Sequence, residues 1–437
     1  MKVKKDKVKL ITLGCSKNLV DSEFILSQIK SNDIEIVEDE NLAENVIINT
    51  CGFIEAAKQE SIDTIMRAVD LKQKGKLKNV YVAGCLSDRY KSELEKDIPE
   101  VDQYFGATDK PQTIFGILNE LGVNYKKDLI GERVVTTPSH FAYLKISEGC
   151  DNPCSFCAIP IMRGGHRSKP LEEILMEAQK LASKGVKELI IIGQDTTYWG
   201  FDKNFNDRKR DLSQVLSELS KIKGIEWIRL MYAYPSRFPS DLTETIRNTG
   251  NICNYIDIPI QHISDNVLKS MRRGITKKNL TDLLYRIREE VPGISIRTTL
   301  ITGYPDETEK DFEELAEFVK EFEFDRLGVF TYSHEDNTYA ANLPDRIPEK
   351  EKLRRQRHLL EIQKEISFRK NRESVGKEFK VLIDRKENGH YIGRSYKDSP
   401  EIDQEIFING KDLKNGDFYN VKIFDAEEFD LFAEVVI

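Results

Sequence analysis

The 437-residue sequence lacks a long apolar run, an excess of positive charge and an even set of cysteines. No stretch approaches the ~20 apolar residues of a membrane span, and the amino-terminal apolar stretch is too short for an export signal, so we expect a cytoplasmic protein. The 66 Lys and Arg against 74 Asp and Glu give a net charge of −8, which argues against a protein that coats nucleic acid. Seven cysteines without an export signal favour metal binding or catalysis over a disulfide framework.

The amino-terminal part of the chain, residues 7–123, alternates short apolar runs with helical patterns. This alternation predicts an α/β domain with a parallel sheet. The expected strands are residues 9–14, 45–50 and 79–84, and the expected helices include residues 22–30 and 54–69.

The central part, residues 136–372, repeats this alternation on a longer scale. Six strand–helix units predict a partial (β/α)6 barrel, in which chemistry sits at the carboxyl ends of the strands. The expected strands are residues 141–147, 188–193, 227–232, 255–260, 295–303 and 326–332, and two of the expected helices are residues 171–185 and 309–322. The charged segment 349–373 is predicted to be one long, solvated connecting helix.

The last part, residues 373–437, changes to short alternating strands separated by Asn-Gly turns. Regular short strands with such turns predict a small all-β barrel. The turn pairs are Asn388-Gly389, Asn409-Gly410 and Asn415-Gly416. We therefore expect an α/β protein of three domains, with boundaries near residues 123–136 and 372–373.

Cys150, Cys154 and Cys157 have a C-x3-C-x2-C spacing and follow the expected strand 141–147. Three thiolates so close in the chain can hold three corners of a cubane iron–sulfur cluster and leave the fourth iron open. An open metal position is where a substrate or cosubstrate binds. The alternative is a structural zinc site, for which His166 is the nearest fourth ligand.

This motif resembles that of the radical S-adenosylmethionine (SAM) superfamily. The resemblance implies that the three cysteines hold a 4Fe–4S cluster and that SAM binds its free iron and is cleaved to a radical that abstracts hydrogen from carbon. The cofactor then performs the difficult chemistry while the protein positions and shields it. The resemblance also suggests SAM contacts, each about as compatible with a structural role: Phe156, Gly193, Gln194, Arg297 and the loop 302–305.

Cys15, Cys51 and Cys85 are far apart in sequence, but each directly follows an expected strand. Because the carboxyl ends of parallel strands meet at one edge, the three thiols should converge, either as a metal site or as buried strand-end cysteines. The surrounding sequences LGCSKNLVDSE, NTCGFIEAA and AGCLSDRY resemble the amino-terminal domain of the methylthiotransferases, a branch of the radical SAM enzymes. That resemblance implies a second 4Fe–4S cluster that handles sulfur. Cys253, outside both groups, is expected to be a buried free thiol.

Methylthiotransferases act either on a tRNA adenosine or on a ribosomal protein. Residues 376–437 carry nine basic and fourteen acidic residues, a net charge of −5, which disfavours RNA, since cations that neutralise phosphates dominate nucleic-acid affinity. The segment GRSYKDSPEIDQEIFI resembles the ribosomal-protein branch, in which these residues fit the pattern: Arg394, Ser395, Asp398, Pro400, Glu401 and Asp403. The resemblance implies a TRAM-like barrel adapted to protein and methylthiolation of the β-carbon of an aspartate in the twelfth small-subunit ribosomal protein. It also implies an electron donor such as a flavodoxin or ferredoxin, and neither a membrane nor a nucleic-acid substrate.

Alternative functions are a tRNA methylthiotransferase, a non-catalytic iron–sulfur protein that binds ribosomes or senses redox state, and a zinc-bound RNA-binding module. Three further residues have two interpretations each. His262 is expected to pack or cap, or to reach the active face. Arg163 and Arg167 are expected either to meet the substrate carboxylate or to lie on the surface.

Overall fold

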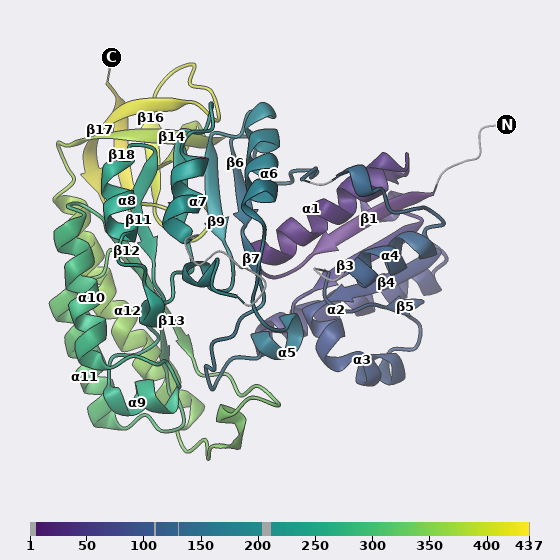
Figure 1. Cartoon of the computed structure of the whole chain (residues 1–437), viewed down its shortest axis with the longest axis horizontal. Coiled ribbons are helices and arrows are strands. Elements are labelled where there is room, and N and C mark those ends of the chain that lie inside the picture. Colours follow the sequence, from purple (N-terminus) through teal and green to yellow (C-terminus); the bar gives the residue numbers. More distant parts are fainter. Residues whose placement is uncertain (1–5, 109–110, 130, 203–210, 437) are drawn as a thin grey trace. The chain divides into compact units, whose positions relative to one another are not determined.

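The computed structural model describes residues 6–108, 111–129, 131–202 and 211–436, which form two compact units (Figure 1). The first unit comprises residues 1–136, 143–151 and 157–180, and the second comprises residues 137–142, 152–156 and 181–437. Residues 109–110, 203–210 and 437, one group in each of the three predicted domains, lie outside the described residues. The two predicted domain boundaries stay a prediction. Among the described residues, no helix is both long and apolar enough to cross a membrane.

The first unit is built on a five-stranded, all-parallel sheet with the order β2-β1-β3-β4-β5. Its strands are β1 (Lys7–Thr12), β2 (Glu35–Ile36), β3 (Asn45–Thr50), β4 (Asn79–Gly84) and β5 (Gln103–Tyr104). Its helices are α1 (Ser16–Ser31), η1 (Glu40–Leu42), α2 (Glu55–Gln73), α3 (Cys85–Asp97), α4 (Pro111–Glu120) and η2 (Lys127–Leu129). The predicted strands 45–50 and 79–84 are observed with the expected bounds.

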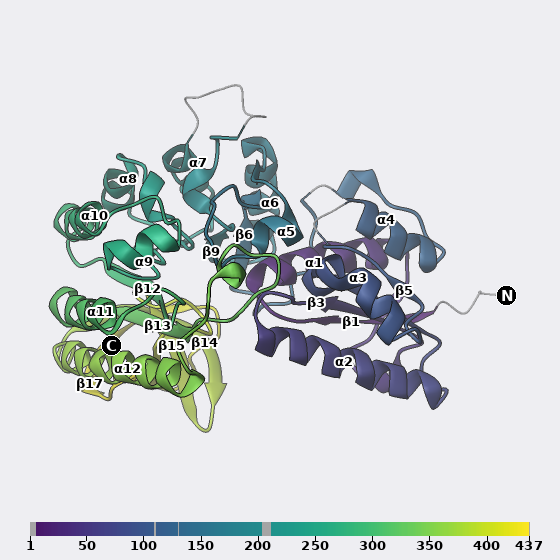
Figure 2. The same cartoon turned by 90° about the horizontal axis from the view of Figure 1, so that it is seen from below.

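Both faces of this sheet are covered, which explains why its strands are apolar throughout. Val46 and Ile48 of β3 pack with Ile65 of α2, whereas Ile47 packs with Ile25 of α1 on the other face. Successive strand residues point to opposite faces, so a run of apolar residues serves two cores. Figure 2 shows α1 and α2 on opposite sides of the sheet.

The segment around the C-x3-C-x2-C motif is divided between the two units, with Cys150 and Cys157 in the first and Cys154 in the second. Strand β6 (Phe141–Lys145) leads into β7 (Ser147–Glu148), which pairs with β8 (Arg167–Ser168) in an antiparallel fashion. The short helix α5 (Ile159–Arg163) lies between β7 and β8 in sequence, and α6 (Leu171–Ser183) follows β8. The cysteine loop therefore follows β7, a short strand that the sequence did not reveal.

The second unit contains β9 to β13 and the first two residues of β6, which belong to a six-stranded sheet with the order β6-β9-β10-β11-β12-β13, in which strand order equals chain order. The strands after β6 are β9 (Glu188–Ile192), β10 (Trp227–Leu230), β11 (Ile252–Asp257), β12 (Ser295–Thr302) and β13 (Arg326–Thr331). The helical elements are η3 (Thr196–Tyr198), α7 (Leu212–Leu219), η4 (Pro235–Arg237), α8 (Leu242–Asn248), α9 (Asp265–Ser270), α10 (Lys277–Glu290), α11 (Glu309–Phe322) and η5 (Ala340–Asn342). The predicted parallel, barrel-like sheet is confirmed.

Strand β11 begins and ends earlier than the expected strand 255–260. Cys253 lies inside β11, not before it, and is 3% exposed, so the expected buried free thiol is confirmed. The strand ends at Asp257 because Pro259 has no N–H to give to a neighbouring strand.

Helix α12 (Glu349–Arg372) connects the sheet to a closed five-stranded barrel. The barrel consists of β14 (Glu378–Glu387), β15 (His390–Ser395), β16 (Glu405–Asn409), β17 (Phe418–Ala426) and β18 (Asp430–Val435), shown in yellow tones in Figure 1. The predicted small all-β barrel is thus confirmed. One side of α12 is buried through Leu359, Ile362 and Ile366, so the helix packs against the rest of the protein and is not only a solvated connector.

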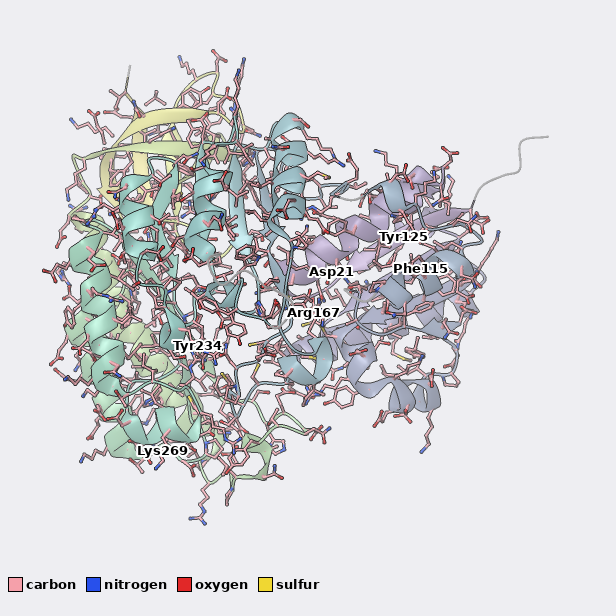
Figure 3. All side chains as sticks on the ribbon, in the orientation of Figure 1. Asp21, Phe115, Tyr125, Arg167, Tyr234 and Lys269 are labelled. Carbon is pink, nitrogen blue, oxygen red and sulfur yellow. The ribbon has the colours of Figure 1, made fainter. Side chains whose placement is uncertain are left out.

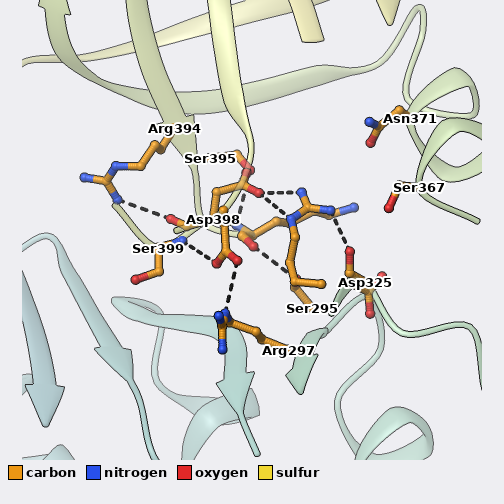
Figure 4. A network of polar contacts seen from close by, with 12 residues as sticks. Ser295, Arg297, Asp325, Ser367, Asn371, Arg394, Ser395, Asp398 and Ser399 are labelled. Carbon is orange, nitrogen blue, oxygen red and sulfur yellow. Dashed lines mark hydrogen bonds and ion pairs between the residues drawn. The ribbon is translucent and has the colours of Figure 1, made fainter. Parts of the chain in front are cut away.

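The closed barrel docks on the amino-terminal ends of the sheet strands (Figure 4). Arg326, the first residue of β13, donates from Nε to Asp398 Oδ1 at 3.0 Å. Ser295, the first residue of β12, donates its hydroxyl to the carbonyl of Lys397 at 3.0 Å. The amino-terminal face of such a sheet serves stability, which leaves the carboxyl ends of the strands for chemistry.

A second set of buried charges completes this docking. Arg394 of β15 pairs with Glu188 at 2.8 Å and with Asp384 at 2.7 Å, and Glu188 also accepts from Arg229 at 2.8 Å. Arg394, Arg229 and Glu188 are each at most 2% exposed. The segment that resembles the ribosomal-protein branch therefore holds the barrel on the sheet.

Candidate metal centres

The carboxyl ends of three neighbouring strands in the first unit each carry a cysteine. Cys15 caps the start of α1 after β1, Cys51 follows β3, and Cys85 is the first residue of α3 after β4. Since β1, β3 and β4 are adjacent, the expected placement of these thiols along one sheet edge is confirmed. Their role as metal ligands stays a prediction.

The turns before two of these cysteines use glycine to bring the chain close. Gly14 has φ +87°, and a Cβ built there would lie 2.6 Å from Cys51 Cβ and 2.8 Å from its Sγ. Gly84, before Cys85, has φ +103°, and a Cβ there would collide with the carbonyl oxygen of Thr50. Any residue with a side chain would push the cysteine-bearing loops apart, so these two glycines let the thiols approach.

Burial governs the protonation of two of the three thiols. Burial raises the pKa of Cys51 and raises that of Cys85 to about 12, and the neighbouring thiols raise both further. Thiols so protonated bind metal only by releasing protons, as cysteine ligands do. Cys51 and Cys85 are 7% and 6% exposed while Cys15 is exposed, so the group opens to solvent on one side.

Among the described residues, no three His, Cys, Asp or Glu side chains surround a point where a single metal ion would sit. A cubane cluster requires a wider arrangement, because each cysteine binds its own iron. Three thiols from adjacent strand ends, backed by close glycine turns, fit that larger group.

The C-x3-C-x2-C loop holds three half-buried cysteines. The backbone N–H of Cys150 donates to the carbonyl of Gly164 at 3.1 Å within the first unit. In the second unit, Arg273 Nη1 donates to Cys154 Sγ at 3.3 Å, and the hydroxyl of Tyr234, labelled in Figure 3, lies 3.5 Å from the same sulfur. Arg273 is 3% exposed, so a buried cation donates a hydrogen bond to the sulfur of Cys154.

Family models match three parts of the chain: the radical SAM superfamily over residues 144–319, an uncharacterised family (UPF0004) over residues 7–106, and the TRAM domain over residues 375–436. The chain is 54% identical over 437 residues to the ribosomal protein uS12 methylthiotransferase RimO of Cytophaga hutchinsonii, covering 99% of this chain and 98% of that one. It is 53% identical to RimO of Christiangramia forsetii, covering 99% and 95%, and 52% identical to RimO of Chloroherpeton thalassium, covering both chains fully.

The chain belongs to the RimO family of radical SAM methylthiotransferases. Among solved structures, the fold resembles the radical SAM methyltransferase TsrM from Kitasatospora setae, with a TM-score of 0.58, 13% identity and 77% of each chain covered. It also resembles the cobalamin-dependent SAM radical enzyme OxsB, with a TM-score of 0.52, 13% identity, and 82% of this chain and 56% of that one covered. Both likenesses concern the fold alone.

The residues suggested for SAM binding in this RimO-family chain occupy different positions. Gly193 and Gln194 directly follow β9, at the carboxyl end of the sheet as expected. Phe156 is half-buried and packs against an apolar group that includes Met271 and Tyr304. These three residues lie where the chemistry of such a sheet is placed.

Arg297 does not lie at a strand end that faces chemistry. It is the third residue of β12, near the amino-terminal end, and pairs with Asp257 at 3.0 Å and with Asp403 of the barrel at 3.3 Å. The strand end near Arg297 is therefore the amino-terminal end of β12, and a contact of Arg297 with SAM stays a prediction. Two carboxylates hold its guanidinium at the docking face.

The loop 302–305 after β12 contacts the cysteine loop directly. The hydroxyl of Tyr304 lies 2.8 Å from the hydroxyl of Ser155, which stands between Cys154 and Cys157. The N–H of Ala340 also donates to the carbonyl of Ser155 at 2.7 Å. Tyr304 therefore helps to hold the cysteine loop in place, a role that the sequence did not reveal.

The remaining candidates lie in different environments. His262 is fully buried, and its Nδ1 accepts from the N–H of Ser264 at 3.0 Å, so the packed interpretation is confirmed. The ring of His166 lies 3.3 Å from Ser168 Oγ. Arg167 is exposed, whereas Arg163 is 2% exposed, which contradicts the expected surface position of Arg163. A contact of either arginine with the substrate carboxylate stays a prediction.

Proposed function

We propose that this chain is a radical SAM methylthiotransferase that adds a methylthio group to the β-carbon of an aspartate in the ribosomal protein uS12. The match to RimO relatives over nearly the full chain carries this proposal. Cys150, Cys154 and Cys157 would hold one 4Fe–4S cluster, with SAM on its open iron. Modification of a ribosomal protein would place the enzyme in the cytoplasm.

A second 4Fe–4S cluster would be held by Cys15, Cys51 and Cys85. Their placement at adjacent strand ends and the close approach of Gly14 to Cys51 support this assignment. Bound together, such clusters and SAM would supply the adenosyl radical that takes hydrogen from carbon and the methylthio group that replaces it.

The chain's own residues contribute positioning and shielding. Arg273 and Tyr234 hold Cys154 through its sulfur, and the hydroxyl of Tyr234 also donates to the carbonyl of Arg273 at 3.0 Å. Tyr304 contacts Ser155 inside the cysteine loop, and Phe156 packs against the apolar group that includes Met271 and Tyr304. A loop held in place in this way helps to keep a reactive intermediate from side reactions. Electrons would come from a flavodoxin or ferredoxin.

The acidic barrel supports a protein substrate over tRNA. Residues 376–437 carry a net charge of −5, and an acidic surface repels a phosphate backbone. The segment around Arg394 docks the barrel, so the substrate would be met by the other faces of the barrel and by the carboxyl ends of the sheet strands.

The test is anaerobic reconstitution with iron and sulfide, followed by turnover with SAM, a reductant and either uS12 or tRNA. We expect a mass gain of one methylthio group on a uS12 aspartate and none on tRNA. Modification of tRNA alone would refute the substrate assignment, and iron for only one cluster would refute the second site.

Matched cysteine variants separate the two sites. Cys154→Ala should abolish SAM cleavage, whereas Cys85→Ala should retain SAM cleavage and lose methylthio transfer. Cys253→Ala, a buried cysteine outside both groups, should retain both reactions. Loss of SAM cleavage in Cys85→Ala with unchanged iron content would contradict the division of roles.

A further inference from the structure

Arg163, the last residue of α5, is buried in the first unit and reaches a cysteine of the strand-end group. Its Nε donates to Cys85 Sγ at 3.3 Å. Its Nη1 donates to Asp21 Oδ2 at 2.7 Å, and its Nη2 donates to Asn18 Oδ1. Asp21 and Asn18 belong to α1, which begins directly after Cys15 (Figure 3 labels Asp21). One guanidinium thus joins the elements that carry two of the three cysteines.

Arg163 and Lys145 both pair with the carboxylates of Asp21 and Glu148. Lys145 donates to Asp21 and, at 2.6 Å, to Glu148, and Arg163 Nη1 lies 3.1 Å from Glu148. Two cations therefore face two carboxylates, and all four side chains are at most 12% exposed. Arg163 contacts these carboxylates through Nη1 and Cys85 through Nε, so a negative charge added at Cys85 would meet a different nitrogen of the same cation.

Helix α5 fixes this contact by packing. Ala158, Ile159 and Met162 form an apolar group with Cys85, so the sulfur is screened from water on the side of α5. In such a poorly polarisable environment a hydrogen bond to sulfur has a larger electrostatic effect than in water. The hydrogen bond to Cys85 is thus both directed and desolvated.

We propose that Arg163 is a positioning residue that raises the reduction potential of the cluster held by Cys15, Cys51 and Cys85. This inference rests on the proposed second cluster. One-electron reduction adds a negative charge to a cluster that three thiolates already make anionic. Hydrogen bonds to the cysteine sulfurs set the potentials of such clusters, and a buried cation that donates to sulfur favours the reduced form. The electron comes from the external donor, and no bond to the protein is made or broken.

The test uses a background in which Cys150, Cys154 and Cys157 are all replaced by alanine, so that only the strand-end site can bind a cluster. The reconstituted protein is titrated with dithionite and mediators, and the reduced cluster is measured by electron paramagnetic resonance. Arg163→Lys keeps a cation for Asp21 and Glu148 but loses the Nε contact with Cys85. We expect the ratio of reduced to oxidised cluster at a fixed potential to fall about tenfold, which is ~59 mV for a one-electron couple.

Arg167→Lys is the matched control. Arg167 lies four residues further on, is exposed, and its guanidinium reaches the carbonyls of Arg163 and Gly165 at 3.4 Å. The reduction potential of the cluster in Arg167→Lys should equal that in the background protein. An equal shift in both variants would refute the inference, because Arg167 has no part in the proposed contact with Cys85 and both substitutions keep the positive charge.

The outcomes separate the inference from the proposal beneath it. Background protein that binds no iron overturns the second cluster and the inference together. A bound cluster with an unchanged potential in Arg163→Lys overturns the inference alone. Circular dichroism of the cluster-free variants identifies a failure to fold. In that case Arg163→Gln, which removes the charge as well, must lower the potential at least as far, and an unchanged value refutes the role of Arg163.

Discussion

Replacing Asp398 with alanine should weaken the attachment of the closed barrel to the sheet. The Asp398 side chain is 1% exposed and accepts from Arg326 at 3.0 Å and from the hydroxyl of Ser395 at 2.8 Å. Its loss leaves the guanidinium of Arg326, which is 15% exposed, without this counter-charge. Removing one partner of a buried ion pair costs about 3–5 kcal/mol, because the other charge stays desolvated.

The matched control is an ion pair on the exposed side of the same barrel. Arg385 donates to Glu405 at 2.6 Å and 2.8 Å, and their side chains are 45% and 33% exposed. Exposed pairs contribute about 0.2–1 kcal/mol, since water and salt screen them. Glu405→Gln should therefore cost several-fold less stability than Asp398→Ala. The double variant Arg326→Met/Asp398→Leu should recover much of the loss, because it removes both buried charges.

Trp227 provides the assay, since its ring lies 4.8 Å from that of Phe418 in the barrel. In a Trp199→Phe background, urea titration of Trp227 fluorescence follows the contact between β10 and β17. Asp398→Ala should shift this transition to lower urea, and Glu405→Gln should leave it nearly unchanged. Equal, small shifts in both variants would refute the view that buried charge pairs hold the barrel in place. No recovery in the double variant would show that the shape of the segment, not its charge, matters.

Three further predictions concern single side chains. Burial lowers the pKa of His262 from 6.5 to about 3. The stability that the neutral ring contributes above pH 6.5 should therefore be lost as the pH falls toward 3, by on the order of 5 kcal/mol. His262→Gln should flatten the pH dependence of urea unfolding in that window. Gly14→Ala should place a methyl against Cys51 and reduce iron from about eight to about four atoms per chain, measured after reconstitution. Cys253→Ala should cost about 1 kcal/mol by denaturation and leave the iron content unchanged, and a loss of iron would implicate this thiol in a cluster.

The ends of a strand were predictable from the sequence where the strand is one unbroken run of apolar residues. The apolar runs at 45–50 and 79–84 are buried on both faces, so their bounds and the cysteines that follow them could be placed in advance. Strand β12 was also predicted, but not which of its ends meets the closed barrel. Arg297 lies near one end of β12 and Thr302 at the other, and only the arrangement of the sheet shows that the end with Arg297 faces the barrel.

Long-range pairing explains the residues whose roles the sequence did not reveal. Arg163 follows the radical SAM motif in sequence, which suggested a substrate contact, yet its partners are Asn18 and Asp21, more than 140 residues away. Asp403 similarly meets Arg297 across 106 residues. Composition and spacing carry no information about such partners, because they depend on how distant elements pack. Buried arginines are the signal to examine, since an arginine is almost never buried unless it is paired.

The net charge of the barrel supports a protein substrate less strongly once the charges that attach the barrel to the sheet are set aside. Three acidic residues of the barrel, Asp384, Asp398 and Asp403, are directed at the sheet and pair with His140, Arg326 and Arg297, while Arg394 is buried beside Glu188. Setting aside these four barrel residues leaves eight basic and eleven acidic residues, a net charge of −3 instead of −5. About two fifths of the acidic excess thus serves the attachment of the barrel and is hidden from any partner. The remaining charge still disfavours a phosphate backbone, but it rests on residues away from the conspicuous Arg394–Asp403 segment. Substrate choice in this chain therefore depends on the outer faces of the barrel.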